Sequence, residues 1–258
     1  MIKIENIKKS FDEKEVLKGI SAEFENGKTN LIIGQSGSGK TVLLKTLLGI
    51  NTPDSGTISF DGRIYSDLTK DEKRELRTEI GMVFQGSALF DSMTVEQNVG
   101  FPLRMFSNKR RSEIKERVDA VLERVNLTEA FRKFPSEISG GMQKRVAIAR
   151  AIVNNPKYLF CDEPNSGLDP GTSILIDELI HEITVEYDIT TVINTHDMNS
   201  VLQIGEKILF LKQGIKAWEG NKEEVLTTDN EDIVEFVYSS DLFKKVRETH
   251  LKELKSGR

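Results

Sequence analysis

The chain has 258 residues, of which 38% are hydrophobic and 30% are charged, and its net charge at pH 7 is -5. This composition excludes a disordered chain, and the negative charge gives no general attraction to nucleic acids or anionic lipids. No stretch resembles a signal peptide or a membrane span, and the single cysteine, Cys161, excludes an internal disulfide. We therefore expect a cytoplasmic protein that needs other subunits if it acts at a membrane.

The first quarter of the chain is predicted to be rich in β structure. Its apolar residues alternate or form short runs bounded by Gly, Asn, Asp and Pro, which favour turns. The predicted strands and hairpin span residues 2–7, 19–28, 29–34 and 53–65. A helix is expected to begin at Lys40 and to end at Gly49, because glycine stops helices.

The middle third is predicted to be helical. Thr94 and Gln97 have the spacing of a capping box before a helix that Pro102 is expected to kink or to end early. A further amphipathic helix is predicted from the apolar stripe of Ile114, Val118, Val121, Leu122 and Val125. Residues 91–155 are therefore expected to form an inserted helical subdomain.

Strands and helices alternate again in the last third. The predicted strands and closing hairpin lie within residues 157–164, 190–197 and 208–220. The pattern predicts an α/β fold with a mostly parallel sheet, an antiparallel β subdomain and the helical insert. The expected boundaries are a core of residues 1–90 and 156–230, the insert of 91–155 and a tail of 231–258.

A glycine-rich segment between the strand at 29–34 and the following helix predicts a phosphate-binding loop. It matches the P-loop pattern G-x-x-x-x-G-K-[ST], in which backbone amides and a helix N-terminus surround an anion. Lys40 is expected to reach the β- and γ-phosphates, and the Thr41 hydroxyl to bind Mg²⁺. The predicted nucleotide contacts are Gly34, Gln35, Ser36, Gly37, Ser38, Gly39, Lys40 and Thr41. Neither Asn-Lys pair of the chain has the aspartate of a guanine-binding motif, which disfavours GTP.

Two carboxylates follow a largely apolar strand at residues 158–161. Such a strand ends at the edge of the sheet where open α/β sheets bind ligands. Asp162 is expected to contribute to the Mg²⁺ site, and Glu163 to polarise the attacking water as general base. Cys161 lies inside the apolar run and is expected to pack in the core.

Ser139, Gly140 and Gly141 stand at the start of another predicted helix. Their hydroxyl and amides could bind a second phosphate, although taken alone they favour an ordinary serine N-cap.

Together, these motifs resemble the ATP-binding subunits of ABC transporters over nearly the whole chain. Residues 138–143 resemble the ABC signature, 165–170 the D-loop, and Gln85 the Q-loop glutamine. His196 resembles the switch histidine, and Phe11 the aromatic A-loop residue, although tyrosine is more usual there. A P-loop with five further motifs in the expected order is a specific signal.

The resemblance implies a catalytic arrangement. Two copies would pair head to tail around two ATP molecules, each lying between the P-loop of one copy and residues 139–141 of the other. Gln85 would contact Mg²⁺ and the attacking water and sense the membrane subunit. His196 would contact the γ-phosphate, and Phe11 would stack on adenine. The implied cofactors are ATP and Mg²⁺, with Thr41, Gln85 and Asp162 at the metal.

Two segments, 80–104 and 135–152, are most similar to Mla-type ATPases, which act in lipid transport with MCE-domain proteins. This resemblance implies ATP hydrolysis at the cytoplasmic face of the cell membrane, on permease subunits and with an MCE-domain partner. The D-loop, however, has the general SGLDP form. Osmoprotectant and peptide importers share the SGGM signature, and a soluble ABC ATPase and a small-molecule kinase are weaker alternatives. The tail is expected to be a solvated helix or to stabilise the dimer or an accessory protein.

Overall fold

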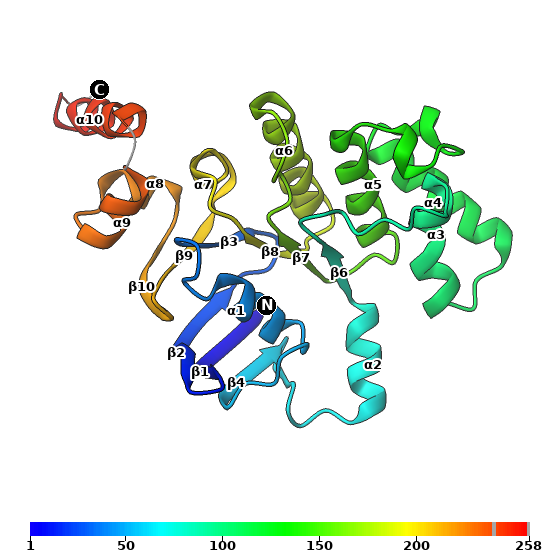
Figure 1. Ribbon diagram of the computed structural model, residues 1–258, viewed down its shortest axis with the longest axis horizontal. Coiled ribbons are helices and arrows are strands. Elements are labelled where there is room, and N and C mark those ends of the chain that lie inside the picture. Colours follow the sequence, from blue (N-terminus) through cyan, green and yellow to red (C-terminus); the bar gives the residue numbers. More distant parts are fainter. Residues whose placement is uncertain (239–240, 257–258) are drawn as a thin grey trace. The chain divides into compact units, whose positions relative to one another are not determined.

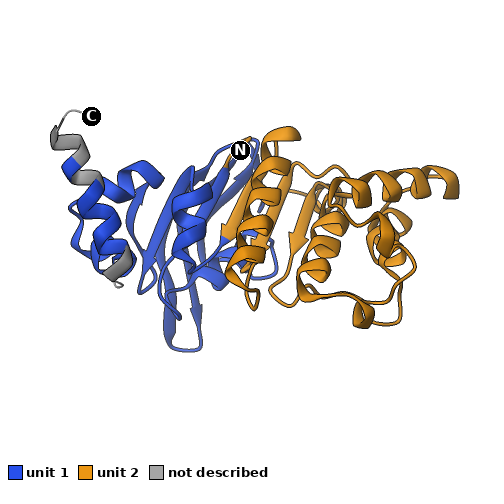
Figure 2. Ribbon diagram, turned by 90° about the horizontal axis from the view of Figure 1, so that it is seen from above, with its two compact units in different colours: residues 1–25, 29–66, 194–258 blue, residues 26–28, 67–193 orange. Residues whose placement is uncertain are grey.

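The computed structural model describes residues 1–238 and 241–256. Positions 239, 240, 257 and 258 of the predicted tail lie outside the described residues. By their internal contacts, the residues form two compact units, of 1–25, 29–66 and 194–258, and of 26–28 and 67–193 (Figure 2). None of the helices in the described part of the chain is long and apolar enough to cross a membrane.

In its described residues, the first unit contains two groups of strands with five helices (Figure 1). Its strands are β1 (Ile2–Phe11), β2 (Lys14–Phe24), β3 (Thr29–Ile33), β4 (Ser55–Phe60), β5 (Arg63–Ile64), β9 (Lys207–Lys212) and β10 (Ile215–Gly220). Its helices are α1 (Lys40–Leu47), α7 (Met198–Ile204), α8 (Lys222–Thr227), α9 (Glu231–Val237) and α10 (Asp241–Ser256). One group is antiparallel in the order β2-β1-β4-β5, and the other has the order β10-β9-β3.

Alternating apolar residues explain the antiparallel group. Ile2 of β1 stands opposite Phe24 of β2 and Phe60 of β4, and all three side chains are buried. In the other group, β3 is buried throughout and runs parallel to β9, while β10 returns antiparallel. The P-loop therefore leaves the carboxyl end of a buried strand.

The second unit contains three strands and the helical segments between them. Its strands are β6 (Ile80–Val83), β7 (Tyr158–Asp162) and β8 (Thr190–Asn194), in the order β8-β7-β6. Its α-helices are α2 (Lys70–Thr78), α3 (Val95–Phe106), α4 (Arg111–Arg124), α5 (Gly140–Ile152) and α6 (Pro170–Glu186), with 3-10 turns at Thr128–Ala130 and Pro135–Glu137. β6 and β7 pair in parallel, so their following loops leave from the same sheet edge.

The predicted amphipathic helix is present as α4, and Val118, Val121 and Leu122 are buried. The capping box at Thr94 and Gln97 is also present at the start of α3. The fold class is thereby confirmed, because the chain has the α/β organisation of a P-loop protein with helices between β6 and β7. The boundary of the insert at 91–155 stays a prediction.

Two local expectations differ from the structure. α3 continues past Pro102 to Phe106 and so does not end early, while a kink at Pro102 stays a prediction. The proline removes one helical hydrogen bond, and the burial of Val99 and Leu103 offsets that loss. α2 was not expected from the sequence. Its residues are mostly charged, so the sequence shows no apolar stripe of a helix there. The helix is short and begins with a complete capping box at Thr69 and Glu72.

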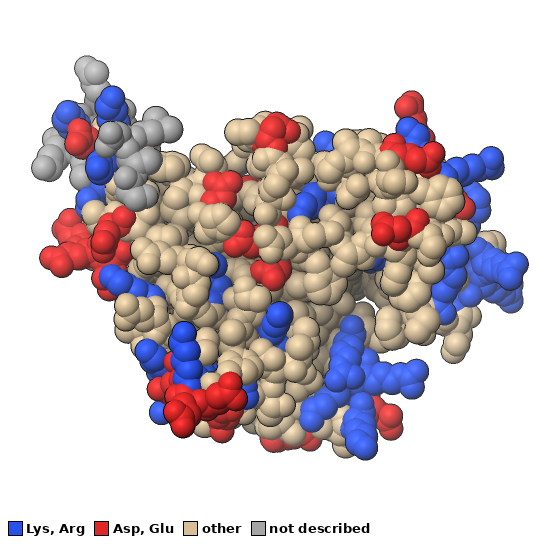
Figure 3. Space-filling view, in the orientation of Figure 1, with Lys and Arg blue, Asp and Glu red and all other residues tan. Residues whose placement is uncertain are grey.

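Charge is unevenly distributed over the surface of the second unit. Lys and Arg side chains gather over α2 and over the connection between α3 and α4 (Figure 3). The sequence places Lys70, Lys73, Arg74 and Arg77 in α2, and Lys109, Arg110 and Arg111 beside the connection. These two parts of the surface therefore carry clustered basic side chains, although the net charge of the whole chain is negative.

Candidate active site

Glycines shape the P-loop between β3 and α1. Gly34 has φ +149°, and a Cβ there would collide with the carbonyl oxygen of Leu211 in β9. Gly39 is left-handed, with φ +105°, and is the N-cap of α1. Residues with a Cβ rarely adopt these backbone conformations. Only glycine therefore lets the loop pass this close to β9 and turn directly into the helix.

Two buried polar side chains of the loop point to an anionic ligand. The side chain of Lys40 donates hydrogen bonds from Nζ to the carbonyl oxygens of Gly34 (2.8 Å) and Gln35 (3.2 Å). Ser38 is only 5% exposed, and its Oγ has no hydrogen-bond partner among the described residues. A buried hydroxyl without a partner costs about 1–3 kcal/mol, which a phosphate oxygen would recover. The loop therefore fits the phosphates of a nucleotide.

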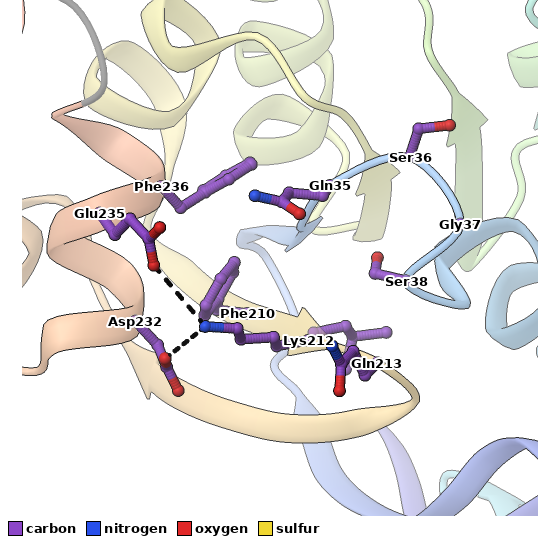
Figure 4. Close-up of a pocket in the computed structure, with 11 residues that line it drawn as sticks. Gln35, Ser36, Gly37, Ser38, Phe210, Lys212, Gln213, Asp232, Glu235 and Phe236 are labelled. Carbon is purple, nitrogen blue, oxygen red and sulfur yellow. Dashed lines mark hydrogen bonds and ion pairs between the residues drawn. The ribbon is translucent and has the colours of Figure 1, made fainter.

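The outer side of the loop is lined by β9 and α9. In Figure 4, the side chain of Gln35 points toward Phe236 of α9, and both residues line a depression together with Glu235. Lys212 lies in this wall, and its Nζ is 2.6 Å from Asp232 Oδ1, an interaction that raises the pKa of Lys212. The charge of Lys212 is thus paired with α9.

Thr41 contacts the segment that leads to His196, the predicted switch histidine. Asn194 ends β8, and its Nδ2 donates a hydrogen bond of 3.3 Å to Thr41 Oγ1. The backbone of Thr195 also donates to the carbonyl of Ile32 in β3. His196 follows in an exposed position. The structure thus brings Thr41 of the P-loop and Asn194 together within the first unit.

Phe11 is exposed at the end of β1, where a ring can stack on a ligand. Its side chain is 43% exposed, and Lys9 Nζ lies 5.4 Å from the ring centroid. An aromatic ring with an accessible face suits a planar base. The adenine contact of Phe11 stays a prediction.

In the second unit, β7 delivers the two carboxylates as expected. Its residues up to Cys161 are buried, and the strand ends at Asp162. Glu163 follows with φ +50°, a left-handed conformation that costs a non-glycine residue about 1–3 kcal/mol. Such strain is concentrated at functional sites, and here it turns the glutamate out of the strand direction.

The predicted D-loop is held by a hydrogen bond to α6. Asn165 Nδ2 donates to Asp177 Oδ2 at 3.2 Å, and both residues are buried. The backbone N–H of Ser166 donates to the carbonyl of Glu163, and Ser166 Oγ accepts a bond of 3.3 Å from Gln85 Nε2. The second unit therefore brings Gln85 and the loop beginning at Glu163 into contact.

Ser139 is the N-cap of α5, and its Oγ accepts the backbone N–H of Met142 at 3.3 Å. The ordinary capping role is thus present, and a phosphate contact by residues 139–141 stays a prediction. A Cβ on Gly141 would lie 2.7 Å from Thr172 at the start of α6, so the close approach of α5 and α6 requires glycine there. Ser139 and Gly140 themselves are exposed.

Cys161 is fully buried, in agreement with the expected packing role. Burial raises the pKa of its thiol far above the usual range, and the carboxylates of Asp177 and Asp162 raise it further. Because only the thiolate is reactive, we expect the native protein to react with a disulfide reagent at pH 8 at least ~100-fold more slowly than the chain in guanidinium. Absorbance measurements of thiol labelling would test this, and equal rates would contradict the buried placement.

The comparisons with known proteins decide the family. The model of the family described as ABC transporter matches residues 17–166. The chain belongs to the ABC transporter family. The Mycobacterium leprae protein named probable ribonucleotide transport ATP-binding protein mkl is 36% identical over 92% of this chain and 68% of its own length. The chain thus spans about two thirds of that relative.

Other relatives of this ABC chain carry different names. The methionine import ATP-binding protein MetN of Campylobacter jejuni is 37% identical over 93% of this chain and 76% of its own length. The chloroplast protein TRIGALACTOSYLDIACYLGLYCEROL 3 of Arabidopsis thaliana is 34% identical over 93% of this chain and 74% of its own length. The family is therefore shown, and the substrate is not decided by the names.

Solved structures agree with the family. The dimeric ABC transporter cassette MJ0796 is 33% identical, with a TM-score of 0.78 over 86% of this chain and 99% of that one. The same cassette is known in a post-hydrolysis state with ADP and Pi, with a TM-score of 0.77. The ABC chain described here is accordingly an ATPase.

Proposed function

We propose that the chain is the ATP-hydrolysing subunit of a transporter for phospholipids, working as a head-to-tail homodimer on membrane permease subunits. The observation that carries the lipid assignment is the similarity to TRIGALACTOSYLDIACYLGLYCEROL 3, whose name is that of a galactolipid. The Mla-type character of residues 80–104 and 135–152 points the same way. An MCE-domain protein is the proposed further partner, and the cytoplasmic face of the cell membrane the proposed location.

The proposed reaction is hydrolysis of ATP by the residues of the predicted motifs. Lys40 and the loop amides would hold the β- and γ-phosphates, and Glu163 would accept a proton from the attacking water. Gln85 would orient that water, and His196 would contact the γ-phosphate. The left-handed backbone at Glu163 supports these assignments, as does the buried hydroxyl of Ser38, which has no hydrogen-bond partner among the described residues.

The proposed metal is Mg²⁺, which would be held by Thr41, Gln85 and Asp162 together with phosphate oxygens. Within the described residues, no group of three His, Cys, Asp or Glu side chains could hold a metal ion. Mg²⁺ in nucleotide sites needs only one or two protein ligands, because phosphates and waters complete its octahedral shell. The donor set of the chain therefore fits a metal that arrives with ATP.

The proposed dimer would place residues 139–141 of one copy on the ATP of the other. The exposed start of α5 supports this, since its amides are accessible to a ligand. The similar cassette MJ0796 is dimeric, which also favours pairing.

The proposed permease-binding surface lies on α3 and on the segment after the Q-loop. Phe90 and Phe101 are in ring contact, with centroids 4.7 Å apart, and Phe90 remains exposed. Met105 and Phe106 at the end of α3 are also exposed. Clustered exposed aromatic and methionine side chains are typical of protein-binding surfaces.

Reconstitution of the ATPase with the permease that is encoded beside it would test the proposal. We expect phospholipid vesicles to increase ATP turnover several-fold in the complex, and methionine or ribonucleotides to have no effect. Phe90→Glu should abolish co-purification with the permease, whereas the exposed control Val185→Glu on α6 should not. Stimulation by methionine alone would instead favour an importer, the second candidate, which the MetN similarity supports.

A further inference from the structure

A buried lysine of α5 has no part in the site described so far. Lys144 is only 5% exposed, although lysines are almost never buried unless their charge has partners. Its Nζ donates a hydrogen bond to the backbone carbonyl oxygen of Gln85. Burial lowers the pKa of Lys144, and attraction to the carboxylate of Glu163 opposes that lowering. The ammonium group therefore lies beside both the Q-loop and the end of β7.

A second cation of α5 holds the same loop two residues further on. Arg150 donates from Nη2 to the carbonyl oxygen of Ser87 and from Nη1 to that of Ala88, both at 2.7 Å. Ser87 and Ala88 are left-handed, with φ +61° and +48°. Such backbone is unfavourable for non-glycine residues and persists only when neighbouring groups hold it. α5 thus holds residues 85–88 by three of their four carbonyl oxygens.

The same helix begins at the signature sequence. Ser139 is the N-cap of α5, and Lys144 lies about 7 Å further along the helix axis at ~1.5 Å per residue. Because a packed helix moves as a rigid body, a shift of its first turn would also shift the donor that holds Gln85. The contact of Gln85 Nε2 with Ser166 would change with it.

We infer that Lys144 is a positioning residue, which holds the backbone of Gln85 and so connects the position of the signature helix to the orientation of the Q-loop side chain. The inference rests on the proposed role of Gln85 in hydrolysis. Without the ammonium group, Gln85 loses one of its two contacts and its side chain becomes less well oriented. We expect ATP binding at the P-loop to be unaffected, since the hydrogen bond of Lys144 holds the loop at Gln85.

Steady-state kinetics of the full chain test the inference. We expect Lys144→Met to lower kcat about tenfold, in keeping with small displacements of catalytic groups, and to leave the KM for ATP within about twofold. Lys144→Arg should keep kcat within about threefold, because a guanidinium can donate to the same carbonyl. The control Lys115→Met, on the exposed face of α4, should leave kcat unchanged. An unchanged kcat in Lys144→Met would overturn the inference.

A double-mutant cycle separates positioning from a general structural effect. In the Gln85→Ala background, Lys144→Met should lower kcat by less than about twofold, because the side chain that Lys144 positions is already absent. A full tenfold loss of kcat in the Gln85→Ala background would overturn the inference. A fall in Tm that accounts for the lost activity would also overturn it. If Lys144→Met does not fold, Lys144→Gln takes its place in the cycle. Gln85→Ala with unchanged kcat would instead refute the proposed role of Gln85 itself.

Discussion

Glu163→Gln is expected to lower ATP turnover by at least ~100-fold and to leave ATP binding intact, because general-base catalysis contributes about 10²–10⁴-fold. The amide has the shape of the carboxylate but cannot take up the proton of the attacking water. The residue already has the left-handed backbone that directs it away from β7, and glutamine can keep this geometry. Phosphate release and binding of a fluorescent ATP analogue would measure the two effects separately.

The same variant also reports on pairing. With hydrolysis blocked, we expect ATP to hold the two copies together, so that gel filtration with ATP shows a dimer and gel filtration without nucleotide shows a monomer. Glu178→Gln, at an exposed position of α6, is the matched control and should hydrolyse ATP normally. Hydrolysis by Glu163→Gln at the parental rate would show that another group is the general base.

Lys40→Ala is expected to weaken ATP binding by at least ~10-fold and to reduce turnover to background. A hydrogen bond to a charged group contributes about 1.5–3 kcal/mol, and Lys40 would make such bonds to the phosphates. The substitution also removes the bonds from Nζ to the carbonyl oxygens of Gly34 and Gln35, which hold the loop in shape. Titration calorimetry with ATP would measure the loss of affinity.

Lys45 offers the matched control for the calorimetry of Lys40→Ala. It lies on α1 as well, in the last turn of the helix, and is exposed. Lys45→Ala should therefore bind ATP like the parent. Normal affinity in Lys40→Ala would mean that the loop does not bind phosphate through this side chain.

Much of the fold could be predicted because its signals are local. β3 and β7 are short apolar runs, α4 has a regular stripe, and the P-loop has its own pattern between a strand and a helix. β2 was expected to begin at residue 19, but it begins at Lys14, because charged residues between Lys14 and Lys18 conceal a strand that pairs with β1. α2 was missed for the same reason, although Thr69 and Glu72 have the capping-box spacing.

The contacts that place the site residues could not be predicted in the same way. Lys144 is 59 residues from Gln85, and Asn194 is 153 residues from Thr41. Neither side chain belongs to a pattern along the chain, and each is identified only by what it contacts. The roles of Glu163, Gln85, His196 and Phe11 stay predictions, and the variants above test those of Glu163 and Gln85.

By itself, the sequence determined the chemistry that the chain can offer: the phosphate loop, the carboxylates after β7 and the serine-glycine start of α5, because these depend on residue types at short spacing. The tertiary structure alone decided that Lys144 and Arg150 hold the loop after β6, that Asn194 reaches Thr41, and that Pro102 stays inside α3. Such features depend on burial and on hydrogen bonds between distant segments, whose free energies exist only once the chain is packed.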